Sequence, residues 1–100
     1  MLLLNNYSNK IILLAETHKN LGLVLVKNKL LDEALSHFRS SLDLVERNYS
    51  NRHLLYSKLL NNIGIVFSEK ENYEEAKIFY QKSLDLKISL LGNFHPIVAN

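Results

Sequence analysis

The chain repeats itself once along its length, and the period of this repeat restricts the fold more than any other feature of the sequence. Shifting the chain by 42 positions places Ser41-Leu42-Asp43-Leu44 on Ser83-Leu84-Asp85-Leu86, and 11 of the 42 residues at 9–50 are identical to their counterparts at 51–92. The other identical pairs include Asn20 with Asn62, Gly22 with Gly64, Val24 with Val66, Glu33 with Glu75 and Ala34 with Ala76. Such a period is typical of repeat proteins, in which each unit is one supersecondary motif packed against the next. We therefore expect a single domain over residues 1–100, with units at about 9–50 and 51–92 and the start of a third helix pair at 93–100.

Within each unit the apolar residues recur at the helical period and not at the two-residue period of a strand. The first unit has two stripes, which are Leu14, Thr17, His18, Leu21, Gly22 and Leu25, and then Leu31, Ala34, Leu35, Phe38, Leu42 and Val45. The second unit has matching stripes, which are Tyr56, Leu59, Leu60, Ile63, Gly64 and Phe67, and then Tyr73, Ala76, Tyr80, Ser83, Leu84 and Ile88. Short polar segments at 27–29 and 69–72 separate the stripes, and Asn72 followed by Glu75 has the pattern of a capping box. Each unit is therefore predicted to be a pair of helices.

Composition agrees with one helical domain that carries no strong charge. With 100 residues, 47% of them apolar, the chain supports one core, and one Pro with three Gly are too few for the turns of a many-stranded sheet. The net charge of +2 comes from interspersed signs, so we expect no binding to nucleic acid or to a membrane surface. The longest apolar run, Leu21–Val26, is too short to cross a bilayer, and the amino end lacks the cationic start of a signal peptide. Because there is no cysteine, we expect a reducing compartment, the cytoplasm.

Small residues recur where the two helices of a pair would cross, with Gly22 and Ala34 in the first unit and Gly64 and Ala76 in the second. Two helices joined by a short turn approach closely only where side chains are small. A large ring, Phe38 or Tyr80, is then expected to fill the space beside the crossing. These glycines and alanines are therefore predicted to be packing residues and not ligand contacts.

Two pairs of fragments resemble the signature segments of the tetratricopeptide repeat family: Lys19-Asn20-Leu21-Gly22 with Asp32-Glu33-Ala34, and Asn61-Asn62-Ile63-Gly64 with Glu74-Glu75-Ala76. The resemblance covers nearly the whole chain. It implies an all-α fold, a right-handed α-solenoid of antiparallel helix hairpins with about two long repeats plus the start of a third. The ordinary period of the family is about 34 residues. The longer period here, together with Leu91-Gly92 followed by His95-Pro96, resembles the repeats of kinesin light chains.

The first helix of each pair is expected to line the concave surface of such an array. The residues predicted to face it are Glu16, Lys19, Asn20, Leu23 and Lys27 in the first unit, and Lys58, Asn61, Asn62, Ile65 and Glu69 in the second. The carboxamides of Asn20 and Asn62 offer both a donor and an acceptor, so they suit the backbone of an extended peptide. The family resemblance implies the same use, and the neighbouring lysines favour acidic residues in the ligand. The alternative is that both asparagines bond across the hairpin or face solvent, and that the lysines are only solvated.

No pattern in the sequence indicates a catalytic or metal centre. Ser41 and Ser83 lie on the inner stripes without a Gly-x-Ser-x-Gly turn, so they are predicted to pack and not to act as nucleophiles. His18 and His37 lie on different helices, and no pair of the four histidines has the one-turn spacing of a helical metal motif. The glycines are isolated from one another and form no phosphate-binding loop. We expect no enzymatic activity, no cofactor and no metal.

These observations predict a non-catalytic protein–protein interaction module, whose partner is a protein or an extended peptide with acidic residues. Two other functions fit the same sequence. One is a structural scaffold that forms a homo-oligomer through uncapped ends, because stable arrays generally need three or more units. The other is a regulatory segment of a larger signalling or motor-adaptor protein. RNA-binding helical repeats need a basic groove, which Glu16 and Glu69 oppose.

Overall fold

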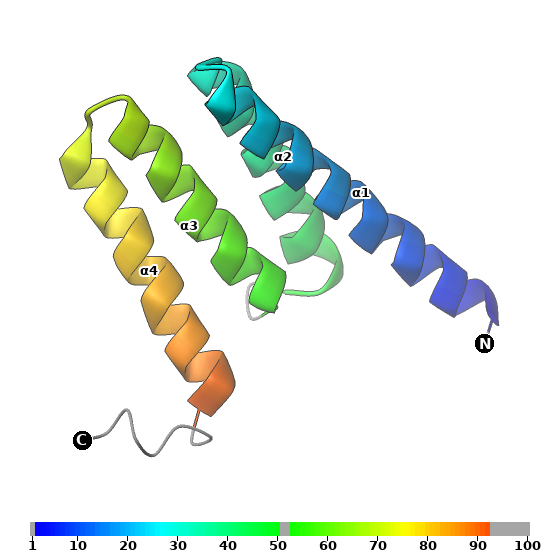
Figure 1. Cartoon of the computed structure of the whole chain (residues 1–100). Helices are drawn as coiled ribbons and strands as arrows, with labels where there is room; N and C mark the ends of the chain where they lie inside the picture. Colours follow the sequence, from blue (N-terminus) through cyan, green and yellow to red (C-terminus); the bar gives the residue numbers. More distant parts are fainter. Residues whose placement is uncertain (1, 51–52, 93–100) are drawn as a thin grey trace.

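The chain forms four helices arranged as two antiparallel hairpins (Figure 1). A computed structural model describes residues 2–50 and 53–92 and, within the first helix, the side chains from residue 9 onward. The helices are α1 (Leu2–Lys27), α2 (Leu31–Asn48), α3 (Leu54–Glu69) and α4 (Tyr73–Leu91). Helix α1 packs on α2, α3 packs on α4, and α2 lies against α3, which leaves α1 and α4 at opposite ends of the row. The predicted all-α helical repeat array is confirmed, and the predicted start of a third pair at 93–100 lies outside the described residues.

The turns inside the two hairpins have the same backbone geometry at equivalent positions of the repeat. Lys29 and its counterpart Glu71 both adopt the left-handed conformation, with φ of 63° and 62°. The next N–H then reaches back to the preceding helix, from Leu30 to the Leu25 carbonyl at 2.9 Å and from Asn72 to the Phe67 carbonyl at 2.8 Å. The Asn72 carboxamide accepts a bond from the Glu75 N–H at 3.5 Å, so the predicted cap at Asn72 is confirmed. Leu30, at the same place in the first hairpin, has no polar side chain and makes no such bond.

The small residues lie where the helices of each hairpin cross, as predicted. A methyl group added to Gly22 would lie 2.4 Å from the Phe38 ring, and one added to Gly64 would lie 2.7 Å from the Tyr80 ring. Ala34 and Ala76 are buried on the opposing helices. A ring therefore occupies the volume that glycine leaves free in both hairpins, which sets the distance between the paired helices.

Two buried serines tie the helices of each hairpin together. The Ser41 hydroxyl donates to the Ala15 carbonyl at 2.7 Å, and the Ser83 hydroxyl donates to the Ser57 carbonyl at 2.7 Å. In the second hairpin Ser57 returns the contact, since its own hydroxyl donates to the Ser83 carbonyl at 2.9 Å. Ser41 and Ser83 are therefore packing residues that also hydrogen-bond across the hairpin. Buried hydroxyls need such partners, because an unpaired one would cost roughly 1–3 kcal/mol.

The core lies between the two hairpins and not evenly within each. Its buried cluster joins Phe38 and Val45 of α2 to residues of α3, which are Leu55, Leu59, Ile63 and Val66. The matching stripe of α1 is different, because Leu14 and Leu21 are 48% and 44% exposed. No helix lies on the outer side of α1 in the described residues, so half of the apolar stripe predicted for the first unit faces solvent.

Candidate functional site

A hollow of about 260 Å³ opens on the side of the molecule where α1, α3 and α4 face one another. Its lining residues are Lys19 and Leu23 from α1, Lys58, Asn61 and Asn62 from α3, and Ser83 and Lys87 from α4. The internal repeat explains how α1 and α3 reach one surface, since the first helices of successive hairpins present the same face. The structure thus brings together five of the residues predicted for the groove, two from α1 and three from α3.

The charges around this hollow are predominantly positive. The ammonium group of Lys19 pairs with the Glu16 carboxylate at 2.8 Å, one turn earlier on α1. Neither Lys58 nor Lys87 has a carboxylate partner among the described residues. Two lysines from different helices therefore leave their charge available at one hollow, which favours a ligand with carboxylates.

Asn62 is a largely buried polar residue of the hollow, with only 9% of its surface exposed, and of the lining residues only Ser83 is more buried. No hydrogen bond joins its carboxamide to another residue in the described part of the chain. Every fully buried polar side-chain atom there does have a partner, so the carboxamide atoms of Asn62 must still reach the surface of the hollow. A carboxamide held in this way keeps its donors and acceptor for an incoming group.

The other predicted residues lie around this hollow or away from it. Asn20 is exposed on α1, Ile65 is half-buried on α3, and neither lines the hollow. Glu16 stands at its edge through the pair with Lys19. Lys27 is exposed at the end of α1. Glu69 ends α3 and binds the Lys29 ammonium group at 2.6 Å, so it links the two hairpins.

Sequence reasoning missed Ser83 as a lining residue and Lys87 altogether, since it assigned the groove to the first helices alone. The two residues are four apart on α4 and so share one face of that helix. The repeat gave no signal for Lys87, because its counterpart in the first unit is Val45, a buried core residue. The only indication was a lysine at a position that the other unit keeps apolar.

Two histidines that are far apart in the sequence meet between α1 and α2. The Nδ1 atoms of His18 and His37 are 3.0 Å apart, and the ring centres are 5.2 Å apart. The difference between these two distances, 2.2 Å, is about twice the distance from Nδ1 to the centre of an imidazole ring. The two Nδ1 atoms and the two ring centres therefore lie almost on one line. The two Nδ1 atoms then point at each other, so that the N–H of one ring donates to the lone pair of the other, and neither atom points at a third position where a metal would sit. No third histidine or carboxylate completes a metal-binding group among the described residues.

One tyrosine near the junction between the hairpins has a shifted titration. Burial raises the pKa of Tyr56 above its ordinary value of 10.0, and the nearby negative charge of Glu46 raises it further. Tyr56 does not line the hollow, and its hydroxyl is neutral at neutral pH.

Comparisons with known proteins agree with this architecture. No curated protein and no solved structure matches the chain. None of the described helices is both long enough and apolar enough to span a membrane. The family described as tetratricopeptide repeat matches residues 13–99, which include α2, α3, α4 and the second half of α1. The chain belongs to the tetratricopeptide repeat family, whose members are generally protein–protein interaction modules.

Proposed function

We propose that the chain is a non-catalytic module that binds an extended, acidic peptide segment of another protein in the hollow between α1, α3 and α4. The observation that carries the proposal is the carboxamide of Asn62, enclosed among lysines and without a hydrogen-bond partner in the described residues. An enclosed amide of this kind binds a peptide group through both its carbonyl and its N–H. It recognises backbone and so does not depend on the ligand's side chains.

The lysines supply the preference for acidic side chains. Lys58 lies on α3 beside Asn62, and Lys87 lies on α4 across the hollow. A peptide whose backbone bonds to Asn62 would therefore have positive charge on both sides. The volume of about 260 Å³ is below the range of roughly 300–1,000 Å³ that is common for small-molecule sites. It suits one or two residues of a longer chain that continues across the surface.

The chemistry of the hollow favours binding over catalysis. Its one hydroxyl, that of Ser83, already donates to the Ser57 carbonyl, so it has no general base to activate it. The titratable groups that line it are lysines. This supports the proposal that the module acts by holding a partner.

Selection from a library of random peptides would test the proposal directly. We expect the retained peptides to be enriched in Asp and Glu, and their binding to weaken as salt is added. The charge-reversed double variant Lys58→Glu, Lys87→Glu should weaken binding at least tenfold. The matched control is Lys10→Glu, because Lys10 is exposed on α1 and does not line the hollow. The proposal fails if the control weakens binding equally or if no peptide is retained.

Substitution of the two asparagines provides a second test of the site, which leaves its charge unchanged. Loss of one hydrogen bond to the peptide backbone is expected to reduce affinity up to about tenfold in Asn62→Ala. Asn20→Ala changes the equivalent residue of α1, which is exposed and outside the hollow, and should have a smaller effect. Titration of a selected peptide with each variant measures both. A larger loss in Asn20→Ala would move the binding site onto the outer surface of α1.

Two finer assignments accompany the proposal as predictions. The turns of the hairpins, at Lys29 and Glu71, are separated by one long repeat, which supports the kinesin light chain-like subgroup of the family. The absence of cysteine from the sequence supports a cytoplasmic location.

A further inference from the structure

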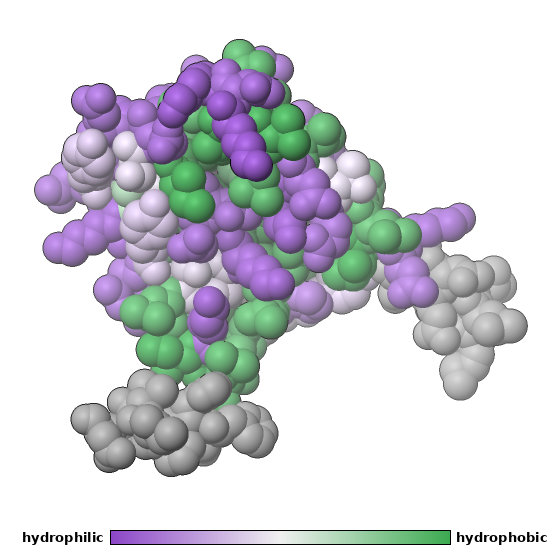
Figure 2. All heavy atoms as spheres, viewed as in Figure 1, coloured by the Kyte–Doolittle hydropathy of each residue, from purple (hydrophilic) through white to green (hydrophobic). Residues whose placement is uncertain are grey.

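The two ends of the helix row each expose an apolar stripe. The stripe on α1, called here the leading face, consists of Leu13, Thr17, Leu21 and Val24. The stripe on α4, called here the trailing face, consists of Tyr73, Lys77, Tyr80 and Leu84, and Lys77 is its one charged member. Exposure reaches 63% at Leu13 and 54% at Val24 on the leading face, and 64% at Tyr73 and 50% at Leu84 on the trailing face. Figure 2 also shows apolar surface gathered over the lower ends of α3 and α4.

The molecule contains a buried version of each face. Moving the leading face forward by one repeat gives Leu55, Leu59, Ile63 and Val66 of α3, which are at most 4% exposed. Moving the trailing face back by one repeat gives Leu31, Leu35, Phe38 and Leu42 of α2, which are buried or half-buried. These two sets belong to the contact of α2 with α3 and pack in one core. The leading and trailing faces are therefore the two halves of an interface that the molecule already forms internally.

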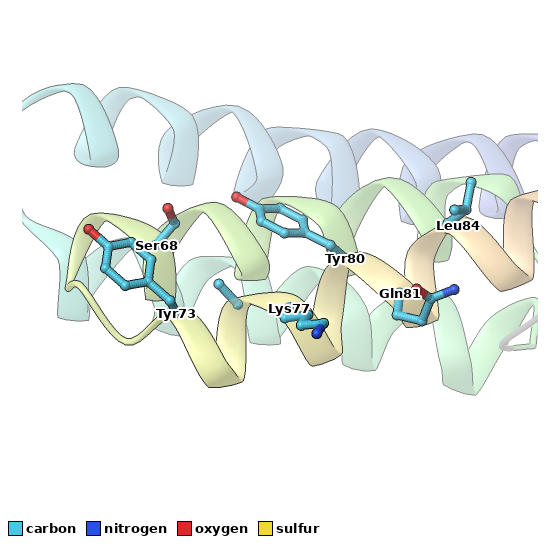
Figure 3. A pocket seen from close by; sticks show the side chains of 7 residues that line it. Ser68, Tyr73, Lys77, Tyr80, Gln81 and Leu84 are labelled. Atoms are coloured by element: carbon cyan, nitrogen blue, oxygen red, sulfur yellow. The ribbon is translucent and has the colours of Figure 1, made fainter.

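The trailing face is also hollowed where the internal contact would place a helix. A depression of about 260 Å³ is lined by Ser68 of α3 and by residues along α4, which include Tyr73, Lys77, Tyr80, Gln81 and Leu84. Figure 3 shows these α4 side chains on successive turns of the helix. The counterparts of Tyr73, Lys77, Tyr80 and Leu84 one repeat earlier belong to the core or pack against it, whereas Arg39, the counterpart of Gln81, is exposed.

The charged residues at the turns of the hairpins indicate which partner fits the leading and trailing faces. Inside the molecule, Lys29 of the first hairpin binds Glu69 of the second at 2.6 Å, and Asp32 of the first binds Lys70 of the second at 2.5 Å. At the trailing end the place of Lys29 is taken by Glu71, and at the leading end the place of Glu69 is taken by Lys27. Both signs are reversed, so the two ends attract each other.

The second ion pair changes in a compatible way. The place of Asp32 is taken by Glu74 at the trailing end, and the place of Lys70 is taken by Asn28 at the leading end. A carboxylate then faces a carboxamide, whose N–H groups are donors for it. Each polar contact of the internal junction therefore has a complementary counterpart between two copies of the same chain.

We propose that the partner of these faces is a second copy of this chain, docked head to tail so that the leading face of one copy covers the trailing face of another. The contact joins unlike surfaces and does not close on itself, so copies add to an open row. Thr17 and Lys77 replace the leucines of the internal junction, Leu59 and Leu35. Association between copies is therefore weaker than the internal contact and depends on concentration. It uses neither Asn62 nor Lys58, so it is independent of peptide binding.

Sedimentation velocity over a concentration series would test the proposal. The wild-type chain should sediment progressively faster as its concentration rises, without a plateau at the dimer. Leu21→Asp blocks the leading face and Leu84→Asp blocks the trailing face, and each variant alone should be monomeric. Both positions are about half exposed, so the fold should be kept, which circular dichroism checks. Ser40→Asp adds the same charge at an exposed position of α2 outside both faces and should associate like the wild type.

The head-to-tail direction of the contact can be tested separately by mixing variants. Mixing Leu21→Asp with Leu84→Asp leaves one intact leading face and one intact trailing face, so the mixture should form a dimer of one copy each and nothing larger. Glu71→Lys should weaken association severalfold, and adding Lys27→Glu in the same chain should restore it. Monomers at every wild-type concentration, association that survives either aspartate, or a mixture that stays monomeric would each overturn the proposal.

Discussion

Gly22 and Gly64 hold equivalent positions, but the rings that they face differ in freedom. Phe38 is completely buried, whereas Tyr80 is partly exposed and has room to turn. Overpacking a rigid site costs roughly 1–3 kcal/mol, and alanine recovers up to about 1 kcal/mol through its helix propensity. We expect Gly22→Ala to lower the free energy of unfolding by about 1–2 kcal/mol and Gly64→Ala to change it by less than about 1 kcal/mol. Urea denaturation of both variants measures the difference, and equal losses would contradict it.

At the residue scale, the sequence predicted the positions of the small packing residues better than it predicted the hydrogen bonds of the polar side chains. The small residues at the crossings were predictable, because a glycine in the same place in both units has a packing reason. The bond from Ser41 to the Ala15 carbonyl was not, since a backbone acceptor has no sequence signature. The same limit applies to Asn62, whose pattern is identical to that of Asn20. Only the neighbouring helices make one enclosed and the other exposed.

At the element scale, the two hairpins use different chemistry for one contact. His18 and His37 meet in the first hairpin, and their counterparts in the second are the apolar residues Leu60 and Phe79. Either single replacement, His18→Leu or His37→Phe, leaves one imidazole without its bond and should lower the free energy of unfolding by about 1 kcal/mol. The double variant should regain that loss, because it introduces the apolar residues that occupy the equivalent positions of the second hairpin.

A double-mutant cycle at neutral pH measures this coupling. Urea denaturation of the wild type, the two single variants and the double variant should give a coupling energy of about 2 kcal/mol, because each single loss of about 1 kcal/mol is absent from the double variant. Additive losses would mean that the two rings do not stabilise each other.

Helix pairs were predictable at this scale because the apolar period and the breaks at the turns agree in both units. The packing of each pair was less predictable. The apolar stripe of α1 was predicted to be buried, but half of it is exposed. The burial of a stripe depends on whether another helix packs against it, and not on the stripe itself. The same reason kept α4 out of the predicted groove, although Lys87 reaches it.

For the whole molecule, stability should be concentrated in the middle of the row. Helix α3 has eight buried residues and packs on both sides, whereas α4 has two, Ala76 and Ser83. In a repeat array each element is stabilised mainly by its neighbours. We expect backbone amides of α3 to exchange with deuterium most slowly and those in the second half of α4 most rapidly. Mass spectrometry of the Leu21→Asp variant, which should be monomeric and leaves α3 and α4 unchanged, measures this order, and uniform exchange along the four helices would contradict it.

The left-handed residues at the two turns separate architecture from recognition. The turn is held by backbone bonds, so Lys29 and Glu71 carry opposite charges at the same corner without any change in its shape. Both side chains are exposed, so neither has to pack against the rest of the fold. A single substitution at such a corner can therefore change which neighbour a hairpin accepts while the hairpin itself is inherited intact. Repeats of this kind can diverge in their pairing long before they diverge in form.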